Sequence, residues 1–344
     1  MIGSIGDLLN SSPGPSLAAI LLVAGLALLM LGGHWVVDGS VRIAERLGIS
    51  TLIIGLTVVA FGTSAPELAL NIIAALSGSS KLSFGNVIGS NIANIGLVIG
   101  ISAVILPLYV TSKVLRREMP LMVLATVLTI CLGALGWVLP GTGGFAGFGW
   151  IQGLVLTLCF VFCAILWVRQ GLGDRKDKLV EEAHNLVSQN EPASIWPGFW
   201  LCLLGLLALI IGGKLTETGA VGLAQWWGLS DELIGLTIVA VATSLPEIST
   251  SLTALKRNQP DLAVGNVVGS NLFNLLLVLG VTAFAGVVPI PMPFGWWDLG
   301  AMLVFTIILV PIAISGPARI TRAEGITLLV MYAAYITWSI LREI

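Results

Sequence analysis

The sequence predicts an all-α polytopic membrane protein whose ten transmembrane helices form two inverted five-helix repeats. Three observations lead to this fold class: the composition, the number of long apolar runs and an internal repeat. Of the 344 residues, 56% are hydrophobic and only 10% are charged, and the mean hydropathy is +1.00. A soluble fold does not need so much apolar surface, whereas a bilayer core of about 30 Å takes about 20 apolar residues per helix.

Ten apolar runs of this kind are separated by short polar connections. We expect spans near residues 17–38, 51–76, 82–107, 119–139, 146–169, 197–217, 232–256, 262–289, 297–315 and 323–341. The segment before the first run has neither the basic region nor the cleavage site of a secretory signal, so we expect the first run to remain as a span.

The basic residues gather in the odd-numbered connections of this ten-span plan. Thirteen of the 16 lie there: Arg42, Arg46, Lys113, Arg116, Arg117, Arg169, Arg175, Lys176, Lys178, Lys256, Arg257, Arg319 and Arg322. The positive-inside rule therefore predicts that both termini lie outside and that segment 171–195 is cytoplasmic. We expect an integral protein of the cell (inner) membrane.

The two halves of the chain repeat each other at a constant offset of 180 residues. Residues 55–100 and 235–280 align without a gap, and 21 of these 46 positions are identical. We therefore expect a first repeat in residues 1–170, a connector loop in 171–195 and a second repeat in 196–344. The connector contains "DRKDKLVEEAHNL", which is typical of a short amphipathic helix, and it is too short to fold as a calcium-binding domain.

The repeats are expected to be inverted because each contains five spans, an odd number. A second copy then enters the membrane from the opposite side. Inverted repeats with interrupted helices at matching positions are typical of secondary transporters, whose sites lie near the midplane where the repeats meet.

Two matching motifs, "GTSAPE" and "ATSLPE", interrupt the second and seventh runs. Pro66 and Pro246 have no N–H to give to the carbonyls four residues back, which belong to Gly62 and Ala242. We expect a break in each helix, with freed backbone oxygens that are tolerated only where they face a cavity or another partner.

Glu67 and Glu247 follow these prolines, well inside the hydrocarbon, where a carboxylate costs on the order of 2.5–3.5 kcal/mol. An ion pair with a basic residue of another helix would be the structural explanation. However, Lys214 has Glu217 three residues away, Asp38 has Arg42 four residues away, and the other basic residues lie at span ends. The two glutamates, with freed carbonyls and hydroxyls, predict an all-oxygen site for a hard cation, Ca²⁺ in particular.

The third and eighth runs carry "GNVIGSNIAN" and "GNVVGSNLFN". Helical spacing places three polar side chains of each motif on one face. They are Asn86, Ser90 and Asn94 in the first half, and Asn266, Ser270 and Asn274 in the second. A second stripe of Gly85, Gly89, Ala93 and Gly96 predicts close approach of another helix. These polar groups either join helices or complete the cation site.

These four motifs resemble the paired α-repeats of the sodium/calcium exchanger family, within the cation/calcium antiporters. The resemblance implies that Glu67 and Glu247, with the carbonyls of Thr63 and Thr243, bind Ca²⁺. It implies that sodium uses the same glutamates, the side chains of Ser64, Ser90, Ser244 and Ser270, and the carbonyls of Ala60 and Ala240. Asn94 and Asn274 would line the site. Some relatives, including potassium-dependent ones, have an aspartate at the position of Asn274.

The resemblance implies exchange of sodium for calcium by alternating access, in which the first and sixth spans slide across the core of the second, third, seventh and eighth. The glycines of "LMLGGHW" and "LIIGGKL" fit either a sliding surface or plain packing. The alternative is a calcium (cation)/proton antiporter on the same scaffold. A channel is a third possibility.

An enzyme is not expected, because the two histidines, His34 and His184, are far apart and form no HExxH pair. The four cysteines, Cys131, Cys159, Cys163 and Cys202, are expected to be small buried hydrophobic residues and not metal ligands. We expect no cofactor. The expected partners are small inorganic cations, Ca²⁺ and Na⁺, and the lipid bilayer, with no nucleic acid and with a functional monomer.

Overall fold

The structure is a computed structural model, and it describes residues 13–77, 80–138, 142, 144, 146–184, 194–228, 240–314 and 319–342. Within these residues, nine helical segments are long and apolar enough to cross a membrane. The remaining predicted span, 232–256, is described only from residue 240. The all-α membrane class is confirmed, since the described strands have only two residues each.

In the described residues, the second, third, fourth, seventh and eighth spans each consist of several helical pieces, and the other spans are single helices. The first half contains α2 (Pro15–Leu47), α3 (Thr51–Ile54), η1 (Gly55–Val59), α4 (Ala60–Leu76), α5 (Ser80–Ala93), η2 (Asn94–Ile99), α6 (Gly100–Ile105), η3 (Val114–Glu118), α7 (Met119–Leu135) and α8 (Trp150–His184). The second half contains α9 (Trp196–Trp226), α11 (Ala240–Thr243), α12 (Leu245–Lys256), α13 (Pro260–Leu272), η5 (Phe273–Val278), α14 (Leu279–Ala285), α15 (Gly295–Ile314) and α16 (Arg322–Leu341). The η segments are π-helical turns, which often mark functional sites.

Several helices are longer than their apolar runs. The 33 residues of α2 extend about 50 Å at 1.5 Å per residue, well beyond a 30 Å hydrocarbon core. Arg42 and Arg46, predicted to lie in a connection, therefore belong to its last turns. The segment predicted as a connector is not a loop throughout, because α8 continues to His184. Hydropathy marks the part of a helix that lies in lipid, not the point at which its hydrogen bonds end.

The two prolines have different effects on their helices. In the seventh span the predicted break is present: α11 ends at Thr243, Ser244 forms a turn, and Pro246 lies in the first turn of α12. In the second span the predicted break is wrong, since α4 runs continuously through Pro66. The irregularity of that span lies one turn earlier, in η1.

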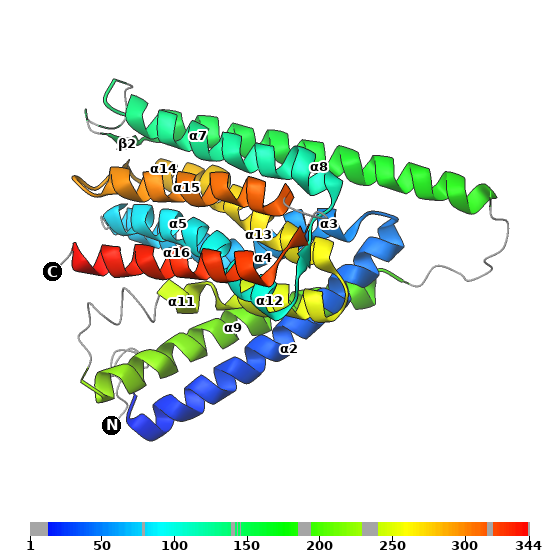
Figure 1. The fold of residues 1–344 in the computed structure, drawn as a ribbon, viewed down its shortest axis with the longest axis horizontal. Helices are drawn as coiled ribbons and strands as arrows, with labels where there is room; N and C mark the ends of the chain where they lie inside the picture. The colour runs from blue at the N-terminus through cyan, green and yellow to red at the C-terminus, as the bar shows by residue number, and fades with distance from the viewer. Residues whose placement is uncertain are drawn as a thin grey trace.

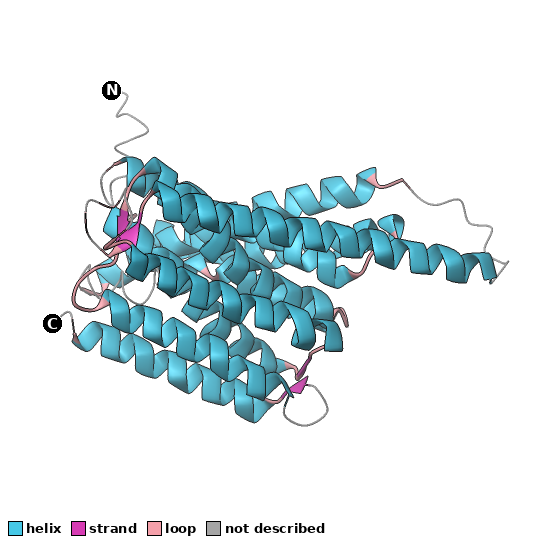
Figure 2. Cartoon of the chain, turned by 90° about the horizontal axis from the view of Figure 1, so that it is seen from above, coloured by secondary structure: helices cyan, strands magenta, loops and turns pink. Residues whose placement is uncertain are grey.

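The helices α2 and α9 lie side by side at the edge of the bundle, on the side away from α7 and α8 (Figure 1). Glycines allow their backbones to approach closely. A Cβ at Gly205 would lie 2.6 Å from the Val36 amide nitrogen, and one at Gly39 would lie 2.5 Å from the Cys202 amide nitrogen. Viewed from above, the helices run roughly along one direction (Figure 2).

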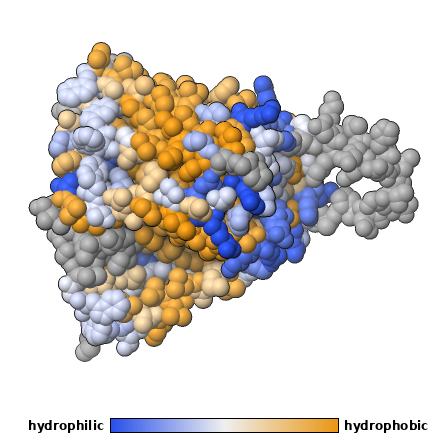
Figure 3. All heavy atoms as spheres, viewed as in Figure 1, coloured by the Kyte–Doolittle hydropathy of each residue, from blue (hydrophilic) through white to orange (hydrophobic). Residues whose placement is uncertain are grey.

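The first described residues of α2 and the last of α16 lie at the same end of the molecule, and the end of α8 lies at the other (Figure 1). Hydrophobic residues cover the middle of the face shown in Figure 3, and hydrophilic residues gather toward the end where α8 extends. The chain is an integral membrane protein.

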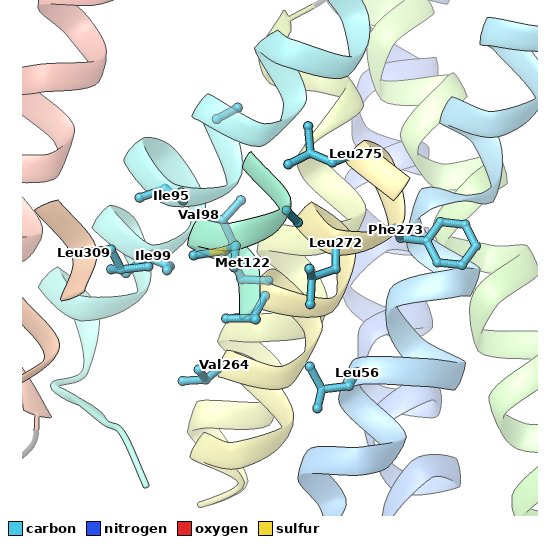
Figure 4. Packing of buried hydrophobic residues seen from close by; sticks show 14 of the residues in the cluster. Leu56, Ile95, Val98, Ile99, Met122, Val264, Leu272, Phe273, Leu275 and Leu309 are labelled. Atoms are coloured by element: carbon cyan, nitrogen blue, oxygen red, sulfur yellow. The ribbon is translucent and has the colours of Figure 1, made fainter. Parts of the chain in front are cut away.

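The core packs spans of both halves together (Figure 4). Leu56 of η1 lies near Leu272 of α13, and Met122 of α7 lies between spans of the two halves. Each of these side chains is fully buried. At Gly269, a Cβ would lie 2.8 Å from the Leu56 Cα. The predicted close approach along the glycine stripe of the third span is present at Gly96, which packs against Tyr332 and Phe305. It is wrong for Gly85 and Gly89, where a Cβ would meet no described atom within 4 Å.

The offset of 180 residues also relates pairs of contacts. Strand β1 (Leu108–Tyr109) pairs with β4 (Arg319–Ile320), and β2 (Gly147–Phe148) pairs with β3 (Val288–Pro289). Strands β1 and β3 are exact counterparts at this offset. The π-helical turns η2 and η5 likewise begin within one residue of counterpart positions. The repeat in sequence therefore corresponds to a repeat in local structure.

Of the four cysteines, all free, Cys163 and Cys202 are buried and Cys159 is partly buried. The prediction of a buried thiol is wrong for Cys131, which is exposed on the apolar helix α7. A small apolar side chain on a span can face lipid as readily as protein.

Candidate cation site

Glu67 and Glu247 are buried together near the middle of the bundle. Glu67, on α4, has 6% of its surface exposed, and Glu247, in the first turn of α12, has 2%. Their carboxylates are close enough to interact electrostatically. The Oε2 atom of each is buried and has no hydrogen-bond partner among the described residues. Two such carboxylates require a cation or a proton, because buried like charges repel each other.

The ion pairs among the described residues involve acids other than Glu67 and Glu247. Lys214 Nζ lies 3.1 Å from Glu217 Oε2, as the sequence predicted. The predicted pairing of Asp38 with Arg42 is wrong, since Asp38 Oδ1 lies 2.8 Å from Arg257 Nη1. Arg257 reaches Asp38 from the end of α12, a contact between distant segments that helical spacing does not reveal.

Hydroxyl groups of both halves lie beside Glu247. Thr63 Oγ1, on α4, lies 3.3 Å from Asn266 Oδ1 and 3.3 Å from Ser270 Oγ, both on α13. The hydroxyls of Thr63 and Ser270 are hydrogen-bonding partners of the Glu247 carboxylate. A side chain from the first half therefore helps to surround an acid of the second half.

The four predicted serines are all buried: Ser64, Ser90, Ser244 and Ser270. Ser64 Oγ has no hydrogen-bond partner among the described residues. Ser244 lies at the break between α11 and α12. Buried oxygens without protein partners are suited to binding a cation, because a hydroxyl left unpaired in the interior costs free energy.

The asparagines Asn94 and Asn274 are also buried. Asn94 Nδ2 donates a hydrogen bond to Asn271 Oδ1 at 3.0 Å, which links the third span to the eighth. Asn274 Oδ1 has no hydrogen-bond partner within the described part of the chain. Both residues lie in or next to π-helical turns, η2 and η5.

The residues whose backbone carbonyls are predicted as ligands lie on two helices, one continuous and one only four residues long. Ala60 and Thr63 belong to the continuous helix α4, where Ala60 O already accepts a bond from Thr63 Oγ1 at 3.4 Å. Ala240 and Thr243 are the first and last residues of the single turn α11. The break after Thr243 makes this side of the site less regular than the other.

Two polar side chains next to Glu67 and Glu247 were not predicted. Asn71 Nδ2 donates to the Glu67 carbonyl at 2.7 Å and to Asn86 Oδ1 at 2.7 Å. At the offset of 180, Ser251 Oγ accepts a bond from Asn266 Nδ2 at 3.2 Å. The two bonds are counterparts in the two halves. A search for positions that are polar in both repeats, whether or not identical, would have found them.

A cavity of about 610 Å³ leads to Glu67. It lies between the second half of α4, the segment of α9 around Gly213, and α11 with Pro246. Most of its walls are apolar, with Leu70, Ile73 and Ile210 among the lining residues. The cavity connects one carboxylate of the site to one end of the bundle.

The molecule is thus an α-helical integral membrane protein with a buried cluster of oxygen atoms around two carboxylates. A family model described as sodium/calcium exchanger protein matches residues 17–168 and 197–341. The chain belongs to the sodium/calcium exchanger family, which is a family of transporters and not of enzymes.

Individual relatives match over nearly the whole chain. The sodium/calcium exchanger MaX1 of Methanosarcina acetivorans is 31% identical over 339 residues, 92% of this chain and 97% of its own. The inner membrane protein YrbG of Escherichia coli is 33% identical over 274 residues, 78% of this chain and 79% of its own. The solved structure of the sodium-calcium exchanger NCX_Mj, soaked with 2.5 mM Na⁺ and 0.1 mM Ca²⁺, has a TM-score of 0.77 and 32% identity, covering 93% of this chain and 98% of that one.

Proposed function

We propose that this protein is a secondary antiporter that exchanges sodium for calcium across a membrane. The observation that carries the proposal is the pair of buried carboxylates, Glu67 and Glu247, each with an oxygen that lacks a hydrogen-bond partner among the described residues. Membership of the exchanger family and the likeness to NCX_Mj support it.

In the proposed site, Ca²⁺ binds both glutamates together with the carbonyls of Thr63 and Thr243. Calcium takes six to eight oxygen ligands in flexible geometry, which fits a cluster of carboxylates, carbonyls and hydroxyls. Sodium ions occupy several subsites of the same cavity. The ligands proposed for them are the glutamates, Ser64, Ser90, Ser244 and Ser270, and the carbonyls of Ala60 and Ala240, with Asn94 and Asn274 lining the site.

Competition for one charged cavity couples the two fluxes. Either one Ca²⁺ or several Na⁺ ions neutralise the two carboxylates, and the loaded site can then change the side it faces. An empty site leaves two negative charges in a low-dielectric region, which opposes the change. Both ions are transported substrates and not cofactors.

The proposed movement slides α2 and α9, as one unit, across the core that holds the site. Their close glycine contacts with each other support a common movement. We propose that both termini lie outside and that segment 171–195 is cytoplasmic, on the basis of the basic residues in the odd-numbered connections. The two repeats would then be inverted.

Exchange can be measured in vesicles that contain the purified protein. An outward sodium gradient is expected to drive ⁴⁵Ca²⁺ uptake that saturates with calcium and stops when the gradient is removed. If a pH gradient drives calcium uptake and a sodium gradient does not, the proposal fails in favour of cation/proton exchange. Unitary currents without saturation would instead indicate a channel.

Thr63→Val is expected to weaken apparent calcium affinity by about tenfold or more, because a hydrogen bond to a charged group contributes about 1.5–3 kcal/mol. The substitution keeps the shape of Thr63 but removes the hydroxyl that faces Glu247. Half-saturation of sodium-driven calcium uptake measures the effect. The matched control is Thr57→Val on the same span, whose hydroxyl bonds the Ile53 carbonyl at 2.6 Å. Equal affinities for the two variants would contradict a role for the Thr63 hydroxyl, since valine keeps the backbone carbonyl proposed as a calcium ligand.

A further inference from the structure

The helix α2 closes against α12 on the side of the site opposite the cavity. A Cβ at Gly33 would lie 2.7 Å from Ser249 Oγ and 3.0 Å from Thr253 Oγ1. Ser249 Oγ donates a hydrogen bond of 2.5 Å to the Leu29 carbonyl. The face of α12 that carries Ser249 and Thr253, which begins two residues after Glu247, therefore packs against α2 and is partly buried.

An ion pair joins α2 to the residue after α12 at the end of this contact that is farther from Glu247. Arg257 Nη1 lies 2.8 Å from Asp38 Oδ1, and its Nη2 lies 3.4 Å from Asp38 Oδ2. The same Nη2 lies 2.7 Å from Nε2 of His34 on α2. The fork of a guanidinium on a carboxylate fixes both distance and orientation between the two elements. Asp38 and Arg257 also line a small cavity of about 230 Å³ with Arg42 and Gln259.

The counterpart positions in the other repeat form no such contact. At the offset of 180, Asp38 corresponds to Thr218 and Arg257 to Ser77. Thr218 Oγ1 bonds the Lys214 carbonyl at 2.9 Å and Ser77 Oγ bonds the Ala74 carbonyl at 3.1 Å, each within its own helix. Ser77 and Lys214 instead line the 610 Å³ cavity. The larger cavity reaches Glu67, whereas the 230 Å³ cavity at Asp38 and Arg257 is lined by neither Glu67 nor Glu247, so the site is closed on that side.

We propose that the Asp38–Arg257 ion pair, with His34, is a gate that keeps the closed side of the cation site shut. When α2 slides relative to α12, the pair separates and the face of Ser249 and Thr253 lines the opposite path. The pair exists in one repeat only, so the two openings of the path are controlled by different chemistry. This inference rests on the proposed alternating-access function.

The gate can be tested by the reactivity of a cysteine beneath it. Thr253→Cys is placed in the full chain in nanodiscs, where both faces are accessible, with calcium present. A charged methanethiosulfonate reagent then modifies Cys at 253, and peptide mass spectrometry gives the rate at this position separately from the native cysteines. Adding Arg257→Gln is expected to raise the rate about two- to fivefold, the range for a half-exposed ion pair.

Two further variants make the result specific. Lys256→Gln removes the same charge from the neighbouring position and is expected to leave the rate unchanged. The exchanged pair Asp38→Arg with Arg257→Asp is expected to restore the slow rate. The gate is refuted if Arg257→Gln reacts no faster than the parent, or if the exchanged pair reacts as fast as the single variant. Since the readout needs no transport, a failure of sodium/calcium exchange in vesicles would be seen separately.

Discussion

Glu247→Gln and Glu67→Gln are each expected to abolish sodium-driven calcium transport. Each substitution removes a charge and a ligand while it keeps the size of the side chain. Breaking a buried charge arrangement on one side costs about 3–5 kcal/mol, on the order of 10²–10³-fold in affinity. Initial rates of ⁴⁵Ca²⁺ uptake in vesicles measure the loss. Full sodium-driven flux in either variant would show that the site assignment is wrong.

Glu118→Gln is the matched control for these variants. Glu118 is fully buried, and its Oε2 accepts a hydrogen bond of 3.0 Å from Trp167 Nε1 on α8. It lies at the start of the fourth span, outside the proposed site. We expect its glutamine variant to retain transport, because an amide oxygen can still accept the Trp167 bond. The comparison separates loss of a cation ligand from general damage by a buried amide.

Gly212→Ala is expected to destabilise the protein by about 1–3 kcal/mol, the usual cost of overpacking. A Cβ there would lie 2.8 Å from the Leu29 amide nitrogen and 2.9 Å from the Gly25 carbonyl oxygen, so α2 and α9 must separate. The unfolding midpoint in detergent should fall, and transport should slow if the two helices move as one unit.

The neighbouring glycine provides the control for this prediction. At Gly213 a Cβ would meet only the Pro246 ring, at 3.5 Å, which is an ordinary contact. Gly213→Ala should therefore leave the unfolding midpoint unchanged or raise it slightly, since alanine favours helix over glycine. If both variants unfold at the same temperature, the close packing of α2 on α9 does not limit stability.

The membrane class and the positions of the spans follow from the sequence because the apolar runs are long and clearly separated. The two glutamates could also be identified, since an acid within an apolar run has few explanations. The structure confirms the membrane class and places Glu67 and Glu247 together. Their roles in binding particular ions remain predictions.

Long-range contacts could not be predicted from spacing along single helices. The Asp38–Arg257 pair joins residues 219 apart, whereas helical spacing suggested Arg42, the nearest basic residue on the same face. The Asn71–Asn86 and Ser251–Asn266 bonds likewise join different spans. The uninterrupted course of α4 through Pro66 depends on its packing within the bundle, which the presence of a proline does not determine.

Calcium binding to the purified protein tests the central proposal most directly. Equilibrium binding of ⁴⁵Ca²⁺ to the detergent-solubilised chain is expected to saturate, to be displaced by sodium, and to be lost in both Glu67→Gln and Glu247→Gln while Glu118→Gln still binds. Calcium binding that persists in both site variants, or that sodium does not displace, would contradict a shared two-carboxylate cation site.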